Sequence, residues 1–177
     1  NEILWGDGTG RFVSDSSSLV VTHCSSCRTT SVLVKDWNLD GIAELIITNM
    51  DGNNTRWTAN QTGGIPAFSM LSTIPELTGV HDATTMALTG DMNQDGFLDL
   101  YLLNKGQNNS CFYGQRGMFY YENTYQDSAG ASKSKAKWGL LQDFTGDGQL
   151  DLWIAVEDGP NELYIKDITG KFRDPPD

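Results

Sequence analysis

The chain has 177 residues, of which 38% are hydrophobic and 20% charged, and a formal net charge of −11. It has no apolar run near the ~20 residues that a membrane-spanning helix needs, so its composition predicts a soluble globular protein. It also lacks a basic cluster that could meet phosphate groups, which argues against a nucleic-acid partner.

The first predicted element is a β-hairpin at the start of the chain. Residues 1–15, NEILWGDGTGRFVSD, hold two short apolar stretches around a glycine-rich turn. A near copy returns as NELYIKDITGKFRD at 161–174. The segment GDGTGRF (6–12) lacks the Gly-Lys-Ser/Thr ending and the helix that a phosphate-binding loop requires, so a hairpin turn is the better interpretation.

Three acidic turns follow, and their spacing predicts cation binding. They read DWNLDGIAEL (36–45), DMNQDGFLDL (91–100) and DFTGDGQLDL (143–152), and their first aspartates are 55 and 52 residues apart, which is a repeat period. Each has oxygen-bearing side chains at positions 1, 3 and 5, Gly at 6 and an acid at 9, a pattern that suits a hard cation such as calcium. An EF-hand would need Glu at position 12, where the second turn has Leu102, so a turn between strands is predicted.

Short stretches rich in β-branched and aromatic residues flank every acidic turn. The stretches before the turns are 31–36, 86–91 and 138–143, and those after them are 43–49, 98–104 and 150–156. Gly, Asn or Asp bounds each stretch, as is typical of strands. Each repeat is therefore predicted to hold four strands, with the acidic turn between the first and the second.

The combination of D-x-[DN]-x-D-G-x-x-[DE]-L, N-x-L-[YW] and G-[RK]-F resembles the FG-GAP/VCBS repeats, the blades of integrin-α-like β-propellers. The resemblance implies an all-β fold made of three four-stranded propeller blades and an N-terminal half-blade hairpin. It predicts one propeller-type domain over 1–177, with the half-blade at 1–21, blade 1 at 31–75, blade 2 at 84–125 and blade 3 at 136–174. Propellers close with about 4–8 blades, so three blades predict a partial propeller or one that an oligomer completes.

The resemblance also implies calcium ligands at positions 1, 3, 5 and 9, with a backbone carbonyl at position 7. The side-chain ligands would be Asp36, Asn38, Asp40, Glu44, Asp91, Asn93, Asp95, Asp99, Asp143, Thr145, Asp147 and Asp151, and the carbonyls those of Ile42, Phe97 and Gln149. About three Ca²⁺ ions in a structural role are expected. The second turn is expected to bind best, because Glu44 is one methylene longer than Asp and Thr145 offers a neutral oxygen.

Cysteines and glycosylation motifs favour an extracellular location. A local disulfide between Cys24 and Cys27 is favoured over a thioredoxin-like or zinc site, and Cys111 is left either to pair with a neighbouring chain or to be a buried thiol. Extracellular calcium modules have dissociation constants of roughly 10⁻⁴–10⁻³ M, matched to the calcium outside cells. Three N-x-[ST] motifs predict a glycoprotein, at Asn53, Asn60 and Asn108.

The sequence shows no catalytic pairing, since His23 and His81 are isolated, so a protein that is not an enzyme is expected. The predicted role is adhesion, recognition or self-assembly. The alternatives are a lectin-like propeller and a structural subunit of an extracellular filament or ring. Expected partners are copies of the chain, neighbouring blades of a longer chain, a glycan or an extracellular protein. Of the aromatic residues, Tyr101, Trp153 and Tyr164 are predicted to pack between blades, and Trp57 and Tyr125 to lie at the surface.

Overall fold

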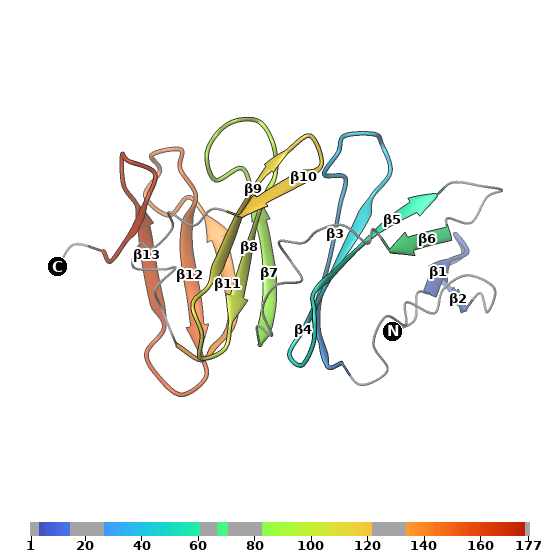
Figure 1. Ribbon diagram of the computed structural model, residues 1–177, viewed down its shortest axis with the longest axis horizontal. Coiled ribbons are helices and arrows are strands. Elements are labelled where there is room, and N and C mark those ends of the chain that lie inside the picture. The colour runs from blue at the N-terminus through green and yellow to red at the C-terminus, as the bar shows by residue number, and fades with distance from the viewer. Residues whose placement is uncertain (1–3, 15–26, 61–66, 71–82, 122–133, 176–177) are drawn as a thin grey trace.

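The structure is a computed structural model that describes residues 4–14, 27–60, 67–70, 83–121 and 134–175. These residues form fourteen β-strands and no helix (Figure 1). Within these ranges there is accordingly no helix long and apolar enough to cross a membrane. The predicted all-β fold is confirmed.

The strands form one hairpin and three four-stranded antiparallel sheets, called blades 1 to 3 below. The hairpin pairs β1 (Leu4–Gly6) with β2 (Phe12–Ser14). Blade 1 contains β3 (Thr29–Lys35), β4 (Glu44–Asn49), β5 (Thr55–Asn60) and β6 (Ala67–Met70). Blade 2 contains β7 (Thr84–Gly90), β8 (Asp99–Asn104), β9 (Ser110–Gln115) and β10 (Met118–Tyr121). Blade 3 contains β11 (Ala136–Gln142), β12 (Asp151–Val156), β13 (Glu162–Lys166) and β14 (Phe172–Arg173).

The three blades stand in a row, with blade 2 between the other two (Figure 1). In each blade the strands follow one another in chain order, and the first strand of blade 2 packs against the first strands of blades 1 and 3. This is the arrangement of successive propeller blades around an axis. The described sheets are therefore consistent with the blades of a partial propeller.

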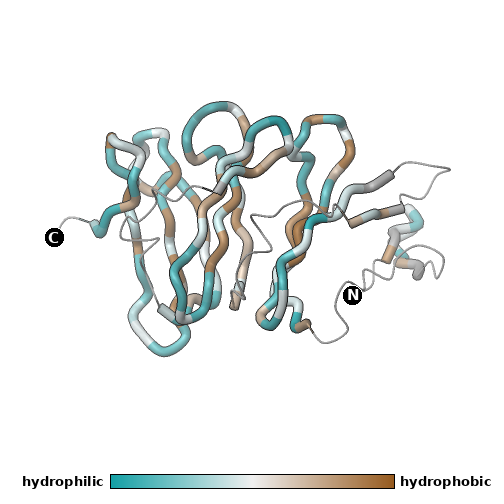
Figure 2. Tube along the Cα trace, in the orientation of Figure 1, coloured by the Kyte–Doolittle hydropathy of each residue, from teal (hydrophilic) through white to brown (hydrophobic). Residues whose placement is uncertain are grey.

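Because side chains alternate along a strand, each blade has two faces, and both carry apolar residues. The face toward the following blade is called the forward face below, and the opposite one the rear face. Between blades 1 and 2, Ile46 of a forward face packs with Leu100, Leu102 and Phe112 of a rear face. Figure 2 shows the result along the chain, with apolar residues concentrated on the strands and polar ones in the connecting turns.

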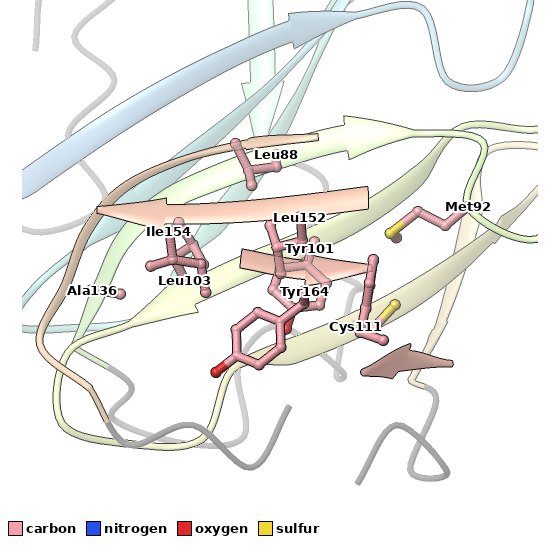
Figure 3. Close-up of a cluster of buried hydrophobic side chains, with 10 residues drawn as sticks. Leu88, Met92, Tyr101, Leu103, Cys111, Ala136, Leu152, Ile154 and Tyr164 are labelled. Carbon is pink, nitrogen blue, oxygen red and sulfur yellow. The ribbon is translucent and has the colours of Figure 1, made fainter. Parts of the chain in front are cut away.

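The junction of blades 2 and 3 holds the larger apolar cluster (Figure 3). Tyr101 and Ile154 are fully buried there, and the ring of Tyr101 meets that of Phe172 edge to face at 6.0 Å. Gly139 allows the sheets to approach closely, since a Cβ at this position would lie 2.6 Å from the Cδ1 of Leu103. The junction is thus packed as tightly as a domain core.

The predictions for the aromatic side chains are partly wrong. Tyr101 and Tyr164 are buried between blades 2 and 3, as predicted. Trp153 instead lies half-buried on the forward face of blade 3, and Trp57 is buried, with 8% of its surface exposed, because its ring packs on the rear face of blade 1 with Leu45 and Ile47. Tyr125 lies outside the described residues.

Two isoleucines test whether this junction stabilises the fold. Ile154→Ala should lower the free energy of unfolding by about 2–5 kcal/mol, because it leaves a cavity in a fully buried cluster. Ile168→Ala is the matched control, since Ile168 is 98% exposed and should change stability by less than about 0.5 kcal/mol. Urea unfolding followed by tryptophan fluorescence measures both, and equal effects would contradict the packing described.

Candidate metal sites

The three acidic turns connect the first and second strands of their blades. Turn 1 (36–44), turn 2 (91–99) and turn 3 (143–151) lie at the same end of the blades, at the top of Figure 1. Their ninth residues are Glu44, Asp99 and Asp151, which begin the second strands β4, β8 and β12. The position of the turns between these strands is as predicted.

The backbone of each turn is folded around the carboxylate at position 1. Asp91 accepts hydrogen bonds from the amides of Asp95 and Gly96 at 3.0 and 2.9 Å, and Asp36 accepts the equivalent bonds in turn 1 at 3.1 and 2.8 Å. The glycines at position 6 are required because the backbone there is left-handed, with φ of 85°, 88° and 86° at Gly41, Gly96 and Gly148.

In blades 2 and 3, the carboxylate at position 9 ties the turn to the third strand. Asp99 is fully buried, and its Oδ2 accepts from the amide of Met92 at 2.7 Å while its Oδ1 accepts from the amide of Gly114, in β9, at 2.8 Å. Asp151 does the same with the amides of Phe144 and Lys166, both at 2.9 Å. Burial raises the pKa of Asp99 to about 6. The sequence reasoning missed this contact and assigned these residues to metal alone.

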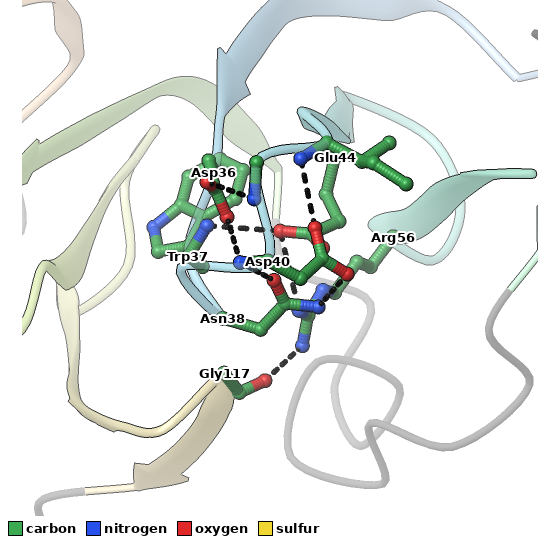
Figure 4. Close-up of polar contacts among 9 residues, drawn as sticks. Asp36, Trp37, Asn38, Asp40, Glu44, Arg56 and Gly117 are labelled. Atoms are coloured by element: carbon green, nitrogen blue, oxygen red, sulfur yellow. Dashed lines mark hydrogen bonds and ion pairs between the residues drawn. The ribbon is translucent and has the colours of Figure 1, made fainter. Parts of the chain in front are cut away.

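Turn 1 is different because its ninth residue is Glu44 (Figure 4). Its Oε2 accepts from the amide of Trp37 at 2.9 Å and lies 3.6 Å from Nη2 of Arg56. Its Oε1 is buried and has no hydrogen-bond partner. Burial raises the pKa of Glu44, and the nearby carboxylates of Asp40 and Asp36 raise it further.

The structure brings the three acids of turn 1 together. Oxygens of Asp36, Asp40 and Glu44 all lie within 4.8 Å of one another, and within the described ranges no other three acidic, histidine or cysteine side chains meet this condition. In turns 2 and 3 the half-buried first aspartate, the exposed fifth and the buried ninth do not form such a group. The geometry therefore favours turn 1, whereas the sequence ranked turn 2 first.

Arg56 is a buried residue of this site that the sequence reasoning missed. Its Nη1 donates to the carbonyl of Gly117, in the β9–β10 turn of blade 2, and its guanidinium lies 5.4 Å from the ring centroid of Phe119. Gly117 has φ of 80°, and a Cβ there would lie 2.5 Å from the Cβ of Asn38 in turn 1. Turn 1 thus contacts the next blade. The positions equivalent to Arg56 in blades 2 and 3 hold Cys111 and Leu163. The charge of Arg56 at this position was therefore the signal in the sequence that could have revealed the contact.

Two of the glycosylation motifs overlap with a turn that the blades need. The side-chain oxygens of Asn54 and Asn109 accept from the amides of Asn49 and Asn104, each at 2.9 Å, and so close the turn between the second and third strands. Each of these asparagines is the middle residue of an N-x-[ST] motif. The hydrogen bond that closes the turn is therefore a structural reason for the asparagine in these two motifs. Of the acceptor residues, Asn108 is exposed, Asn53 is half-buried and Asn60 ends β5; their glycosylation stays a prediction.

The cysteines and histidines are described only in part. Cys27 is disulfide-bonded, but its predicted partner Cys24 lies outside the described residues, as do His23 and His81, so the pairing stays a prediction. Cys111 is a buried thiol at the junction of blades 2 and 3, which favours that alternative over pairing with a neighbouring chain.

Comparison with known proteins identifies part of the chain. Residues 36–102 match the model of the FG-GAP-like repeat family. The match runs from the start of turn 1, through the rest of blade 1 and turn 2, into β8. Comparison with curated proteins gave no match. The resemblance to this repeat family is confirmed over the matched segment.

The contact made by Asp99 can be tested without any metal. Asp99→Asn should lower the free energy of unfolding by about 1–3 kcal/mol in EDTA, because one of two buried amides loses a carboxylate acceptor. Asp95→Asn is the control, since Asp95 is exposed and the new side chain keeps an oxygen for the amide of Phe97. If the two variants were equally stable in EDTA, the structural role of Asp99 would be wrong.

Proposed function

We propose, from the FG-GAP-like repeat in residues 36–102, that the protein is an extracellular calcium-binding propeller module for adhesion, recognition or self-assembly. Calcium has a structural role in this proposal. The observation that carries it is the buried Oε1 of Glu44, which has no hydrogen-bond partner and lies in a group with the carboxylates of Asp36 and Asp40.

A cation resolves an unfavourable arrangement in turn 1. Three carboxylates lie close together, and the only cation beside them in Figure 4, Arg56, reaches Oε2 of Glu44 and leaves Oε1 unpaired. A buried charged oxygen without a partner is costly. Calcium accepts about 6–8 oxygen ligands in irregular geometry. The set that would hold it comprises the side chains of Asp36, Asn38, Asp40 and Glu44 and the carbonyl of Ile42.

Turns 2 and 3 would hold their ions differently. Their backbones repeat the left-handed glycine and the central carboxylate of turn 1. The carboxylates of Asp99 and Asp151 already accept backbone amides. Oδ2 of Asp99 accepts two of them, from Met92 and Asn93, but its Oδ1 and both oxygens of Asp151 keep a second lone pair that can face a cation. The remaining ligands would be Asp91, Asn93, Asp95 and the Phe97 carbonyl in turn 2, and Asp143, Thr145, Asp147 and the Gln149 carbonyl in turn 3.

The charge of the turns supports divalent ions in them, and such ions together with a disulfide support an extracellular location. Nine of the 23 acidic residues lie in the three turns, so three divalent ions would supply six positive charges and change the net charge from −11 to −5. Such sites fill where free calcium is at millimolar level, outside cells. Disulfides persist mainly in oxidising compartments, and Cys27 is disulfide-bonded.

Calcium titration tests this proposal. With a dissociation constant of ~10⁻⁴ M, ~2 mM calcium should stabilise the fold by about 1.8 kcal/mol per site relative to EDTA. Isothermal titration calorimetry should find about three sites in the native protein and one fewer in Glu44→Gln, which loses a charged ligand. Glu157→Gln, outside the turns, should behave as the native protein does. The proposal would be wrong if the protein bound no calcium and were equally stable in calcium and in EDTA.

A lectin-like function is a second candidate because of a pocket between blades 2 and 3. The pocket has a volume of about 360 Å³ and is lined by amide side chains of turns 2 and 3, by Tyr113 and by the β13–β14 turn. Gln94, which lines the pocket, donates from its Nε2 to the carbonyl of Gly148 at 2.9 Å. Amide groups that bond hydroxyls, beside an aromatic ring, suit a saccharide. Small-ligand pockets have volumes of about 300–1,000 Å³.

Substitutions of two tyrosines distinguish a specific saccharide site from non-specific binding. Tyr113→Ala should lower saccharide affinity at least about tenfold, because it removes the aromatic wall of the pocket. Tyr120→Ala is the control, since Tyr120 is 52% exposed and lies on β10, outside the pocket lining. A glycan array followed by titration of the best hit measures both. Binding to no glycan, or equal loss in the two variants, would remove this candidate.

A further inference from the structure

The third strand of each blade contacts the ninth residue of the acidic turn, but blade 1 makes this contact with a charged side chain. In blade 2 the amide of Gly114 donates to Asp99 at 2.8 Å, and blade 3 repeats this bond. In blade 1, Nη2 of Arg56, on β5, lies 3.6 Å from Oε2 of Glu44. A guanidinium carries a full positive charge, whereas an amide is only a dipole. Turn 1 therefore has a cation paired directly with one of its predicted metal ligands.

Both members of this ion pair are buried. Arg56 is 5% exposed and Glu44 is fully buried, so salt and solvent screen their interaction little. The pairing is also incomplete, because Oε1 of Glu44 and Nε of Arg56 have no hydrogen-bond partner. Oε1 thus stays open to an ion while Oε2 faces the guanidinium, and the two cations would share one carboxylate.

Arg56 also connects turn 1 with blade 2 (Figure 4). Its Nη1 donates to the carbonyl of Gly117, and its guanidinium lies 5.4 Å from the ring centroid of Phe119. The same phenylalanine ring meets that of Trp37, from turn 1, edge to face at 5.9 Å. A shift of the guanidinium would therefore change its contact with the β9–β10 turn of blade 2.

We propose that Arg56 is a built-in counter-ion of turn 1, which weakens calcium binding there and links the occupancy of the turn to the contact between blades 1 and 2. Turn 1 brings three carboxylates together, and Arg56 offsets the charge of one of them. The charge of the ligand set tunes calcium affinity, and a fixed cation beside a ligand repels the ion. The inference rests on the calcium site proposed above for turn 1.

This role belongs to blade 1 and is not a requirement of the repeat. The positions equivalent to Arg56 hold Cys111 and Leu163, neither of which is a basic residue. Without calcium, Arg56 keeps the buried Glu44 paired with a cation. An ion on Oε1 weakens the attraction between Glu44 and Arg56, and by linkage this attraction weakens the binding of the ion to the same extent.

Three substitutions separate the charge of Arg56 from its packing. Arg56→Leu removes the charge and introduces the residue type that blade 3 has at this position, whereas Arg56→Lys keeps a positive charge. Arg28→Leu is the control, because Arg28 pairs with Asp51 at the exposed surface and outside the acidic turns. Arg56→Gln replaces Arg56→Leu if circular dichroism shows that the latter is unfolded, and the same result is expected of it.

A calcium titration from EDTA, followed by ¹H–¹⁵N NMR, measures each turn separately. The amides of Gly41 and Gly96 donate to the first carboxylates of turns 1 and 2 at 2.8 and 2.9 Å, so each reports the occupancy of its own turn. Arg56→Leu should raise the calcium affinity of turn 1 at least about fivefold, the lower end of typical coupling between sites, and leave turn 2 unchanged. Arg56→Lys and Arg28→Leu should keep the native affinity in both turns.

The link to blade 2 has its own reporter. The amide of Met118 shares a peptide group with the carbonyl of Gly117, which accepts from Arg56. In the native protein its signal should move with the same calcium midpoint as that of Gly41, and in Arg56→Leu it should stay in place. A Met118 signal that ignores calcium in the native protein would overturn the link.

The affinities decide the rest of the inference. If Arg56 were merely structural, its removal would leave the calcium affinity of turn 1 equal or lower, and this result would overturn the counter-ion role. An equal rise in Arg56→Lys would also overturn it, because the charge would not be the cause. If the Gly41 signal of the native protein did not respond to millimolar calcium, the calcium site of turn 1 itself would be wrong, and the inference with it. Failure of the inference alone is thus distinguishable from failure of the proposed function.

Discussion

The buried carboxylate at position 9 of each acidic turn is the contact on which the rest of a blade depends. In blades 2 and 3 it binds one amide of the turn and one amide of the third strand, so it fixes three strands relative to one another. In blade 1 the longer Glu44 reaches Arg56, which in turn holds blade 2 through Gly117. A buried negative charge thus organises every blade, and a nearby cation would lower the cost of burying it.

The second constraint is that every blade has two apolar faces to bury. A sheet of four short strands is stable only when both faces are covered, and repeats achieve this by stacking. The chain does so at two junctions, with Tyr101 and Ile46 at their centres. Trp138 on the forward face of blade 3 and Val34 on the rear face of blade 1 are 47% and 52% exposed.

The sequence predicted the blades well because their signals are local. Apolar alternation and the Gly at position 6 are read within ten residues, and they placed each turn between the correct strands. The sequence failed where a side chain contacts an element other than its own. Trp57 stands among polar neighbours yet is buried, Arg56 stabilises a contact with a segment 61 residues away, and Asp99 holds a strand as well as facing a turn. None of these partners is visible in a local pattern.

A crystal structure of the protein grown with calcium would show whether turn 1 binds the ion, through the anomalous signal of calcium. We expect an ion in turn 1 with Oε1 of Glu44 among its ligands, at the ~2.3–2.6 Å typical of a calcium–oxygen distance. Electron density that instead shows Oε1 of Glu44 bonded to water or to Arg56, with no ion in any of the three turns at millimolar calcium, would contradict it.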